Sequence, residues 1–243
     1  MTPPRLEAVY FGDGAGHQWP RMARVLAHSA RQQLSGWEVH VRQLHPPPVT
    51  GHAAATESHR ANSQKLQAWV DLVRAAVDGD RLLLIDADTM ILRPLDDVWL
   101  KPFEVAYTER VGVKLPINAG VVFLRVGPFA RHFFEHWLAA NMRLLRDPTE
   151  HQIWRTRYGG INQAALGSIL VEPAGWGLGR LRCQEWNCED ASWTTFDPAR
   201  TRIVHLKSAL RRAVFGIGPS RPGLQPLVAI WRRLEREAGE AGS

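Results

Sequence analysis

Two aspartates stand two residues apart directly after a run of aliphatic residues. In the stretch RLLLIDADTM, the aliphatic residues 82–85 precede Asp86 and Asp88. An uninterrupted aliphatic run predicts a strand that is buried on both faces, as in the centre of a parallel sheet. The carboxylates then lie at the carboxyl end of that strand, where open α/β sheets bind their ligands. Two chemistries fit this pattern: a divalent metal ion that grips a diphosphate, and an aspartyl nucleophile beside an acid–base aspartate.

Electrostatics favours the metal ion, because two unpaired carboxylates at the end of a hydrophobic strand would repel each other without a cation. Mg²⁺ and Mn²⁺ take oxygen ligands and commonly complete their shell with substrate phosphates and water. The nucleophile alternative resembles the haloacid-dehalogenase-like phosphatases, whose first motif also has four apolar residues, a DxD and a threonine. That motif normally opens the chain and is followed by a late acidic pair. Here about a third of the chain precedes it, and Asp96 and Asp97 come too soon.

The elements around this strand predict an α/β layered domain, because candidate strands alternate with candidate helices. We expect strands at 6–12, 38–44, 81–85, 103–108, 120–125 and 202–206. We expect helices at 19–34, 128–145, 162–170 and from 226 onward, and one before the 81–85 strand with apolar residues from Leu66 to Val77 at helical spacing. The segment 45–59 has no periodicity and predicts a loop. We expect one domain over 1–243, in which 213–243 is a C-terminal helical extension.

Composition narrows the class of protein. With 243 residues, of which 45% are hydrophobic, the chain can bury a sizeable core. No stretch approaches the roughly 20 apolar residues of a membrane span, and the start lacks the features of a signal peptide. We therefore expect a cytoplasmic protein without an integral membrane segment. Cys183 and Cys188, in CQEWNC, do not match zinc or redox spacings and are expected to be reduced thiols in a loop.

The chain is basic, with a formal net charge of +6 and a pI of about 9.9. Such a surface attracts nucleotides, nucleic acids or acidic glycans, and the densest basic segment is 200–212. A non-catalytic nucleic-acid-binding protein is therefore a further alternative. The aspartate pair argues against it, because carboxylates in a cleft repel phosphate unless a metal ion is bound.

Further segments accompany the aspartate pair in a fixed order: NSQKLQAW (62–69), TMILRPLDDVW (89–99), INAGVVFL (117–124), GGINQAAL (159–166) and IVHLKSALRR (203–212). In this order the set resembles glycosyltransferase family 8, the group that contains glycogenin. The resemblance covers about 6–212 and depends on the joint pattern, since each piece alone is common. It implies a GT-A fold with a central, mostly parallel mixed sheet flanked by helices. It also implies transfer of a hexose from a UDP-sugar to an acceptor hydroxyl.

The resemblance implies a metal site of Asp86, Asp88 and His205 that holds Mn²⁺, or Mg²⁺, against the donor diphosphate. In the family, glycine follows the histidine three residues later and lysine three residues after that. This chain has Ser208 and Arg211 at those places. Serine can replace glycine only where the backbone is not strongly left-handed, whereas arginine can still clamp phosphate.

The resemblance places further side chains around the donor. Residues 10–12 would flank the nucleobase, Lys65 would reach the phosphates and sugar, and Asn118 would lie on the sugar side. The expected donor-binding residues are Tyr10, Phe11, Gly12, Lys65, Asp86, Asn118, Lys207 and Arg211.

The catalytic candidates are Asn162, Gln163 and Asp190. Asn162 and Gln163 align with a family Asp–Gln pair beneath the transferred sugar, and the amide at 162 excludes a nucleophile there. In WNCED, Asn187 and Asp190 would face the acceptor, and Asp190 is the nearby candidate for a general base. The family implies front-face attack with retention, in which the departing diphosphate accepts the proton. The acceptor is left open, and an anionic one such as modified DNA or a glycan fits the charge.

Overall fold

The computed structural model describes residues 2–11, 18–45, 55–110, 115–171, 177–189, 192–217 and 222–240. The strands are β1 (Arg5–Phe11), β2 (Glu38–Leu44), β3 (Arg81–Asp86), β4 (Thr89–Ile91), β5 (Val105–Glu109), β6 (Ile117–Arg125), β7 (Leu178–Arg182) and β8 (Ile203–His205). The α-helices are α1 (Gln18–Gln33), α2 (Glu57–Ala75), α3 (Pro128–Arg146), α4 (Pro148–Tyr158), α5 (Ile161–Leu170), α6 (Cys183–Trp186), α7 (Ser208–Val214) and α8 (Gln225–Glu240). Short 3₁₀ turns are η1 (Asp96–Leu100), η2 (Trp193–Thr195) and η3 (Pro222–Leu224).

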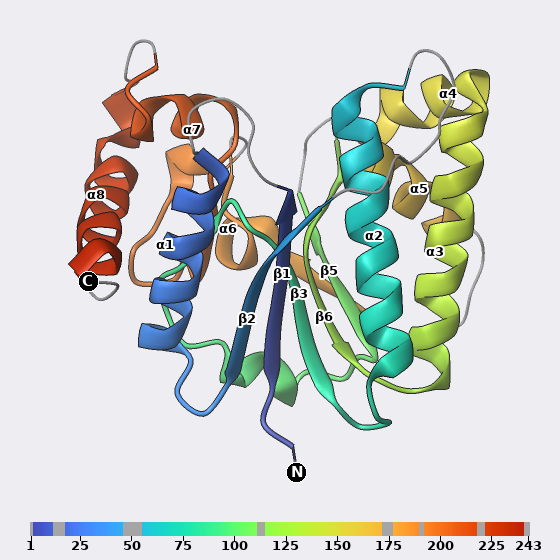
Figure 1. Cartoon of the computed structure of the whole chain (residues 1–243), viewed down its shortest axis with the longest axis horizontal. Helices are drawn as coiled ribbons and strands as arrows, with labels where there is room; N and C mark the ends of the chain where they lie inside the picture. Colours follow the sequence, from blue (N-terminus) through green and yellow to red (C-terminus); the bar gives the residue numbers. More distant parts are fainter. Residues whose placement is uncertain are drawn as a thin grey trace.

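A six-stranded mixed sheet lies at the centre, in the order β2-β1-β3-β6-β5-β7 (Figure 1). The strand β3 pairs in parallel with β1 but antiparallel with β6. The expectation of a wholly parallel neighbourhood for β3 was therefore wrong on one side. The aliphatic run of β3 indicates only that both faces of the strand are buried. It does not indicate the direction of a neighbouring strand, because helices on both faces bury parallel and antiparallel strands equally well. The predicted α/β class is confirmed.

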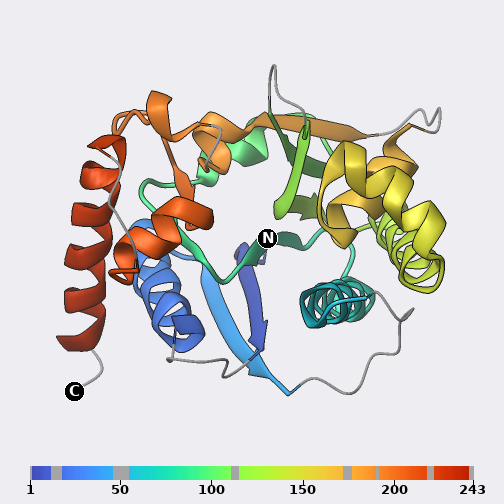
Figure 2. The ribbon, with the colours of Figure 1, turned by 90° about the horizontal axis from the view of Figure 1, so that it is seen from above.

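Side chains alternate across the sheet and feed two core clusters. Leu82 and Leu84 of β3 pack under α2, α3 and α5 with Trp69 and Trp137, whereas Leu83 and neighbouring residues pack under α1. Figure 2 shows α1, α7 and α8 gathered on one side of the sheet and α2 to α5 on the other. A third cluster joins α1, α7 and α8 to β4 and β8. Of the helices in the described ranges, none has the length and apolar character needed to cross a membrane.

The start and end of α2 differ from the expectation. The helix begins at Glu57 because Thr56 caps it: the Thr56 hydroxyl accepts from the His59 backbone N–H, and His59 Nδ1 accepts from the Thr56 N–H, each at 3.2 Å. Ser58 and His59 are therefore helical rather than loop. A capping box normally carries Glu or Gln where His59 stands, which hid the signal. At the other end, Val77 was expected to be the last apolar residue of this helix. It lies two residues beyond Ala75, the last helical residue, and is 70% exposed.

In the small sheet of β4 and β8, the strand β8 was expected from the pattern of 202–206. The strand β4 was not expected, because its three residues show no periodicity. The strand β4 begins three residues after β3 ends, and its register with β8 pairs Thr89 with His205. This pairing sets the end of β8 beside the DxD turn, and it determines the geometry of the site.

Candidate functional site

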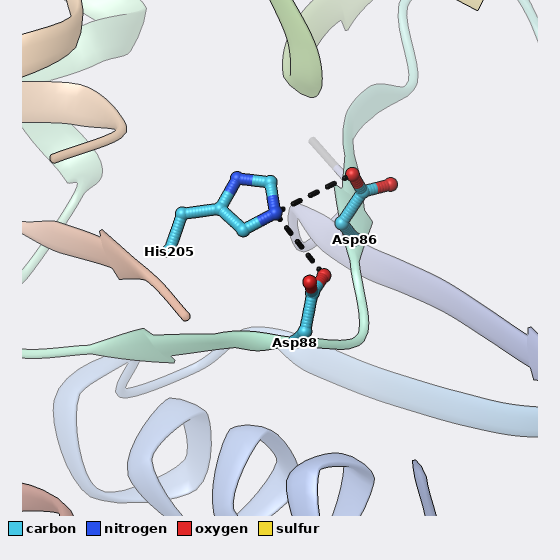
Figure 3. Close-up of side chains that lie close together, drawn as sticks. All are labelled: Asp86, Asp88 and His205. Carbon is cyan, nitrogen blue, oxygen red and sulfur yellow. Dashed lines mark hydrogen bonds and ion pairs between the residues drawn. The ribbon is translucent and has the colours of Figure 1, made fainter. Parts of the chain in front are cut away.

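Asp86, Asp88 and His205 converge although 117 residues separate the last two. One possible ligand atom from each lies within 4.8 Å of the others. His205 Nε2 lies 3.1 Å from Asp88 Oδ1 and 3.7 Å from Asp86 Oδ2, so one edge of the ring faces both carboxylates (Figure 3). The side chains of His205 and Asp88 are buried, whereas that of Asp86 is 20% exposed. The set can therefore hold an ion that remains open to a ligand on the Asp86 side.

The backbone around the three side chains leaves room for such an ion. Gly120 of β6 faces them, and a Cβ there would lie 2.6 Å from His205 Cε1 and 2.7 Å from Asp86 Oδ2. Any other residue would displace one of these side chains, so the absence of a side chain at 120 preserves the arrangement. Two carboxylates and one imidazole form a donor set that suits Mn²⁺ and similar divalent ions. The residues present fit a divalent metal ion.

Cations of the chain already contact both carboxylates, which the sequence did not foresee. Lys65 Nζ of α2 pairs with Asp86, and Arg211 of α7 pairs with Asp88. The expectation of two unpaired, repelling carboxylates was therefore wrong, because distant helices supply positive charge. Burial raises the pKa of Asp88, but attraction to His205, Arg211 and Lys207 outweighs it and holds that pKa well below its usual range. Asp88 is therefore a carboxylate at neutral pH, the form that binds a metal ion.

The three side chains open into a cavity of about 850 Å³ at the end of β1 and β3. Predicted site residues that line it are Tyr10, Phe11, Lys65, Asp86, Asp88, Asn162, Gln163, His205, Lys207 and Arg211. Two other predicted residues, Gly12 and Asp190, lie outside the described residues.

Asn118 and Asn187 are fully buried and do not line the cavity. Asn118 Oδ1 accepts from the Gly120 N–H at 2.9 Å, while its Nδ2 has no hydrogen-bond partner among the described residues. The amide of Asn187 is held at both ends, by Thr108 and by His205. The expectation that Asn187 faces the acceptor was wrong, because its side chain points inward beneath the metal-site histidine.

Asn162 and Gln163 open α5 and differ in how they are held. Asn162 is buried, accepts from Asn141 Nδ2 at 2.7 Å and donates to the Asn62 carbonyl at 2.8 Å, so it ties α5 to α3 and α2. Gln163 Nε2 donates to the Tyr158 carbonyl at 2.8 Å. No described residue donates to Gln163 Oε1, so this oxygen is left for a ligand in the cavity.

Sequence reasoning missed part of the cavity wall: Trp19, Glu57, Ser58, Arg60 and Gln64. Four of these lie on the face of α2 that carries Lys65, and a helical wheel begun at 57 would have found them. Trp19 was detectable only in three dimensions, where the Arg211 guanidinium lies 5.0 Å from its ring.

The two cysteines supply neither a nucleophile nor a ligand. Cys183 is the first residue of α6, and Cys188 pairs with Val204 through an isolated β-bridge of the backbone. The expectation that both thiols lie in a loop was therefore wrong. Both are free and buried. Burial raises the pKa of Cys183 to about 12 and that of Cys188 to about 11, which keeps both as thiols.

No family model and no curated protein sequence matches the chain. Solved structures do. A glycosyltransferase involved in glycosylation of the major capsid of PBCV-1 has a TM-score of 0.58 at 12% identity, covering 86% of this chain and 97% of its own. The galactosyltransferase LgtC has a TM-score of 0.54 at 11% identity, covering 96% and 95%. GlyE of Streptococcus pneumoniae TIGR4 has a TM-score of 0.53 at 14% identity, covering 99% and 64%.

These similarities define the fold as GT-A, the fold of nucleotide-sugar transferases. These three neighbours are glycosyltransferases, and none of them is a phosphatase.

Proposed function

We propose that this chain is a metal-dependent glycosyltransferase, similar to glycosyltransferase family 8, that moves a hexose from a UDP-sugar to an acceptor hydroxyl. One observation carries the proposal: Asp86, Asp88 and His205 converge in the lining of a large cavity in a GT-A fold. We propose a single catalytic domain over 1–243, with 213–243 as a C-terminal extension, acting in the cytoplasm.

The donor diphosphate would lie between the metal site and α7. Asp86, Asp88 and His205 would hold Mn²⁺ or Mg²⁺, which would neutralise the diphosphate and make it a better leaving group. Lys207 and Arg211 line the same cavity. Their charges would stabilise the negative charge that develops as the diphosphate departs, a term that is usually large in such sites. Lys65 would help from the opposite side, where it contacts Asp86.

Retention of the donor's anomeric configuration fits the residues near the sugar. Among the described lining residues, the carboxylates are Glu57, Asp86 and Asp88. Asp86 and Asp88 belong to the metal site, and Glu57 lies in the exposed first turn of α2. At the start of α5 the cavity is lined instead by the amide side chains of Asn162 and Gln163. Front-face attack needs no protein nucleophile, because the departing diphosphate can accept the proton from the acceptor.

An anionic acceptor, such as modified DNA or an acidic glycan, fits the basic wall of the cavity. Arg60 lines the cavity and pairs with no described acidic residue. Its guanidinium can therefore bind a phosphate or carboxylate that the acceptor carries.

A thermal-shift panel of UDP-, GDP- and ADP-sugars, each with and without Mn²⁺, tests the proposal. A ligand at a hundred times its Kd stabilises the folded state by about 2.7 kcal/mol. For a chain of this length that corresponds to a rise in Tm of roughly 5–10 °C. We expect this rise only with a UDP-sugar and Mn²⁺ together, followed by sugar transfer or slow donor hydrolysis. Binding of DNA without any response to nucleotide sugars would instead favour a non-catalytic binding protein.

A further inference from the structure

A chain of buried hydrogen bonds leads from the backbone of β6 to the metal-site histidine. The Thr108 hydroxyl donates to the Asn118 carbonyl oxygen at 2.8 Å. The Asn187 amide donates to Thr108 Oγ1 at 2.9 Å, and Asn187 Oδ1 lies 3.0 Å from His205 Nδ1. Thr108 and Asn187 are 0% exposed and His205 is 1% exposed, so water does not stand in for any link.

The direction of each bond follows from the first one. A backbone carbonyl can only accept, so the single hydroxyl proton of Thr108 points to Asn118. Thr108 Oγ1 must then accept from Asn187, which turns the NH₂ group of that amide toward Thr108. The carbonyl oxygen of the amide therefore faces His205. Because that oxygen can only accept, Nδ1 of His205 must carry a proton.

A histidine that binds a metal ion does so as a neutral imidazole with one proton, and with that proton on Nδ1 the lone pair lies on Nε2. Nε2 is the atom that faces Asp86 and Asp88 (Figure 3). A proton on Nε2 can donate to Asp88 across 3.1 Å, and a metal ion that binds there takes the place of that proton while Nδ1 keeps its own. Groups that orient the second nitrogen of a histidine ligand commonly contribute 10–100-fold to metal affinity.

We propose that Thr108 and Asn187 are positioning residues that hold Nδ1 of His205 as a donor and so present the Nε2 lone pair to a divalent ion. The inference rests on the proposed function for its consequence, metal binding. The hydrogen bond from Nδ1 to Asn187 that it assigns is present without a metal ion and can be measured separately.

The first measurement is Mn²⁺ affinity in the presence of UDP, by electron paramagnetic resonance. Asn187→Leu, which removes the acceptor, should weaken Mn²⁺ binding by about 10–100-fold. Thr108→Val, which frees the amide to rotate, should weaken it by a smaller factor, roughly 3–10-fold. Asn187→Asp should retain the affinity, because a carboxylate still accepts from Nδ1.

Thr201→Val is the matched control for loss of a buried threonine hydroxyl. Thr201 is 1% exposed, donates to the Gln184 carbonyl at 3.2 Å and does not line the cavity. The Thr201→Val variant should lower Tm about as much as Thr108→Val does, while its Mn²⁺ affinity stays within about twofold of wild type. Equal loss of affinity in both threonine variants would overturn the inference, because it would report general destabilisation.

The second measurement is the ¹H–¹⁵N spectrum of the His205 ring in the metal-free protein. We expect a proton on Nδ1 that exchanges slowly in the wild type and in Thr201→Val, and that exchanges rapidly or is lost in Asn187→Leu. A wild-type spectrum with no proton on Nδ1 overturns the inference, as does a folded Asn187→Leu that binds Mn²⁺ within twofold of wild type. If wild type binds no Mn²⁺, the proposed function fails, and the spectrum alone decides the protonation pattern. If Asn187→Leu does not fold, the spectrum and Thr108→Val remain decisive.

Discussion

The two walls of the cavity differ in how completely their polar groups are paired. On the metal-site wall, Asp86 contacts Lys65, Asp88 contacts Arg211, and His205 contacts Asn187. On the α2–α5 wall, Asn162 is bonded to Asn141 and Asn62. The other polar groups there, Arg60, Gln64 and the Oε1 atom of Gln163, line the cavity without a partner among the described residues.

Gln64 belongs to this set, because it lines the cavity and its amide has no hydrogen-bond partner among the described residues. An amide that lines a cavity can form hydrogen bonds with a ligand there. The metal-site wall is therefore assembled before a ligand arrives, whereas the α2–α5 wall is completed by one. Substitutions on the first wall should abolish binding, and substitutions on the second should change rate and specificity.

The largest effect is expected on the metal-site wall. Asp88→Ala and His205→Ala should each remove Mn²⁺-dependent UDP binding, a loss of at least about 100-fold, because each deletes one of three ligands. Isothermal titration with UDP and Mn²⁺ measures this, and circular dichroism checks the fold. Asp71→Ala, at an exposed aspartate of α2 outside the cavity, should bind as wild type does. Unchanged metal-dependent binding in both site variants would remove the basis of the proposed function.

The paired wall also shows what the sequence could and could not predict. Asp86 and Asp88 were predictable because they end and follow a recognisable strand, His205 was assigned through the resemblance to the family, and the structure brings the three together. Their partners were not predictable from local pattern. Lys65 is an ordinary helix lysine until α2 packs against β3, and Asn187 was expected to face the acceptor although it is fully buried. Burial and pairing arise from packing between distant segments, which one sequence does not display.

The helices and strands also divide into those that the sequence pattern predicted and those that it did not. Long elements with clear periodicity were predicted within a few residues: β2 lies where the alternating pattern of 38–44 placed it, and α3 spans Pro128–Arg146. Elements without such a pattern were missed. They include α4, whose apolar residues form no clear stripe, and the three-residue β4, which packing rather than propensity specifies.

The next effect is expected at Gln163 on the α2–α5 wall. Gln163→Ala should lower kcat by roughly 10–100-fold and raise the donor KM less, because Oε1 would interact most strongly as positive charge builds on the sugar. Gln152→Ala, at an exposed glutamine of α4, is the control. The stereochemistry of the product is read by NMR. A β-linked product from an α-linked donor, with Gln163→Ala fully active, would contradict both the retaining mechanism and this role.

A smaller effect is expected at Arg60, which tests the acceptor. Arg60→Ala should raise the KM for an anionic acceptor by about 3–10-fold and flatten its dependence on salt, because one screened charge contact is lost. Arg24→Ala, at an exposed arginine of α1 that does not line the cavity, matches the change in net charge and should have no effect. If the KM of the wild type is already flat from low to physiological ionic strength, the basic surface does not contribute to acceptor binding.

The smallest effect is expected next to the metal-site wall, at Ser208, whose backbone φ is +38°. This value lies in the left-handed region, although serine was expected to be tolerated only outside it. A residue with a Cβ pays roughly 1–2 kcal/mol there, whereas glycine costs about 0.5–1 kcal/mol in unfolded-chain entropy. The first term is larger, so Ser208→Gly should stabilise the fold by about 0.5–1 kcal/mol and raise Tm by roughly 1–4 °C.

Ser208→Ala separates the backbone effect from loss of the hydroxyl. It keeps the Cβ and the strain, so its Tm should not rise. Because the backbone of wild type already has the conformation that glycine favours, UDP affinity in Ser208→Gly should stay within about twofold of wild type. An equal rise in Tm for both variants would show that the hydroxyl, not the left-handed backbone, carries the cost. A fall in Tm for Ser208→Gly alone would show that unfolded-chain entropy outweighs the strain at this position.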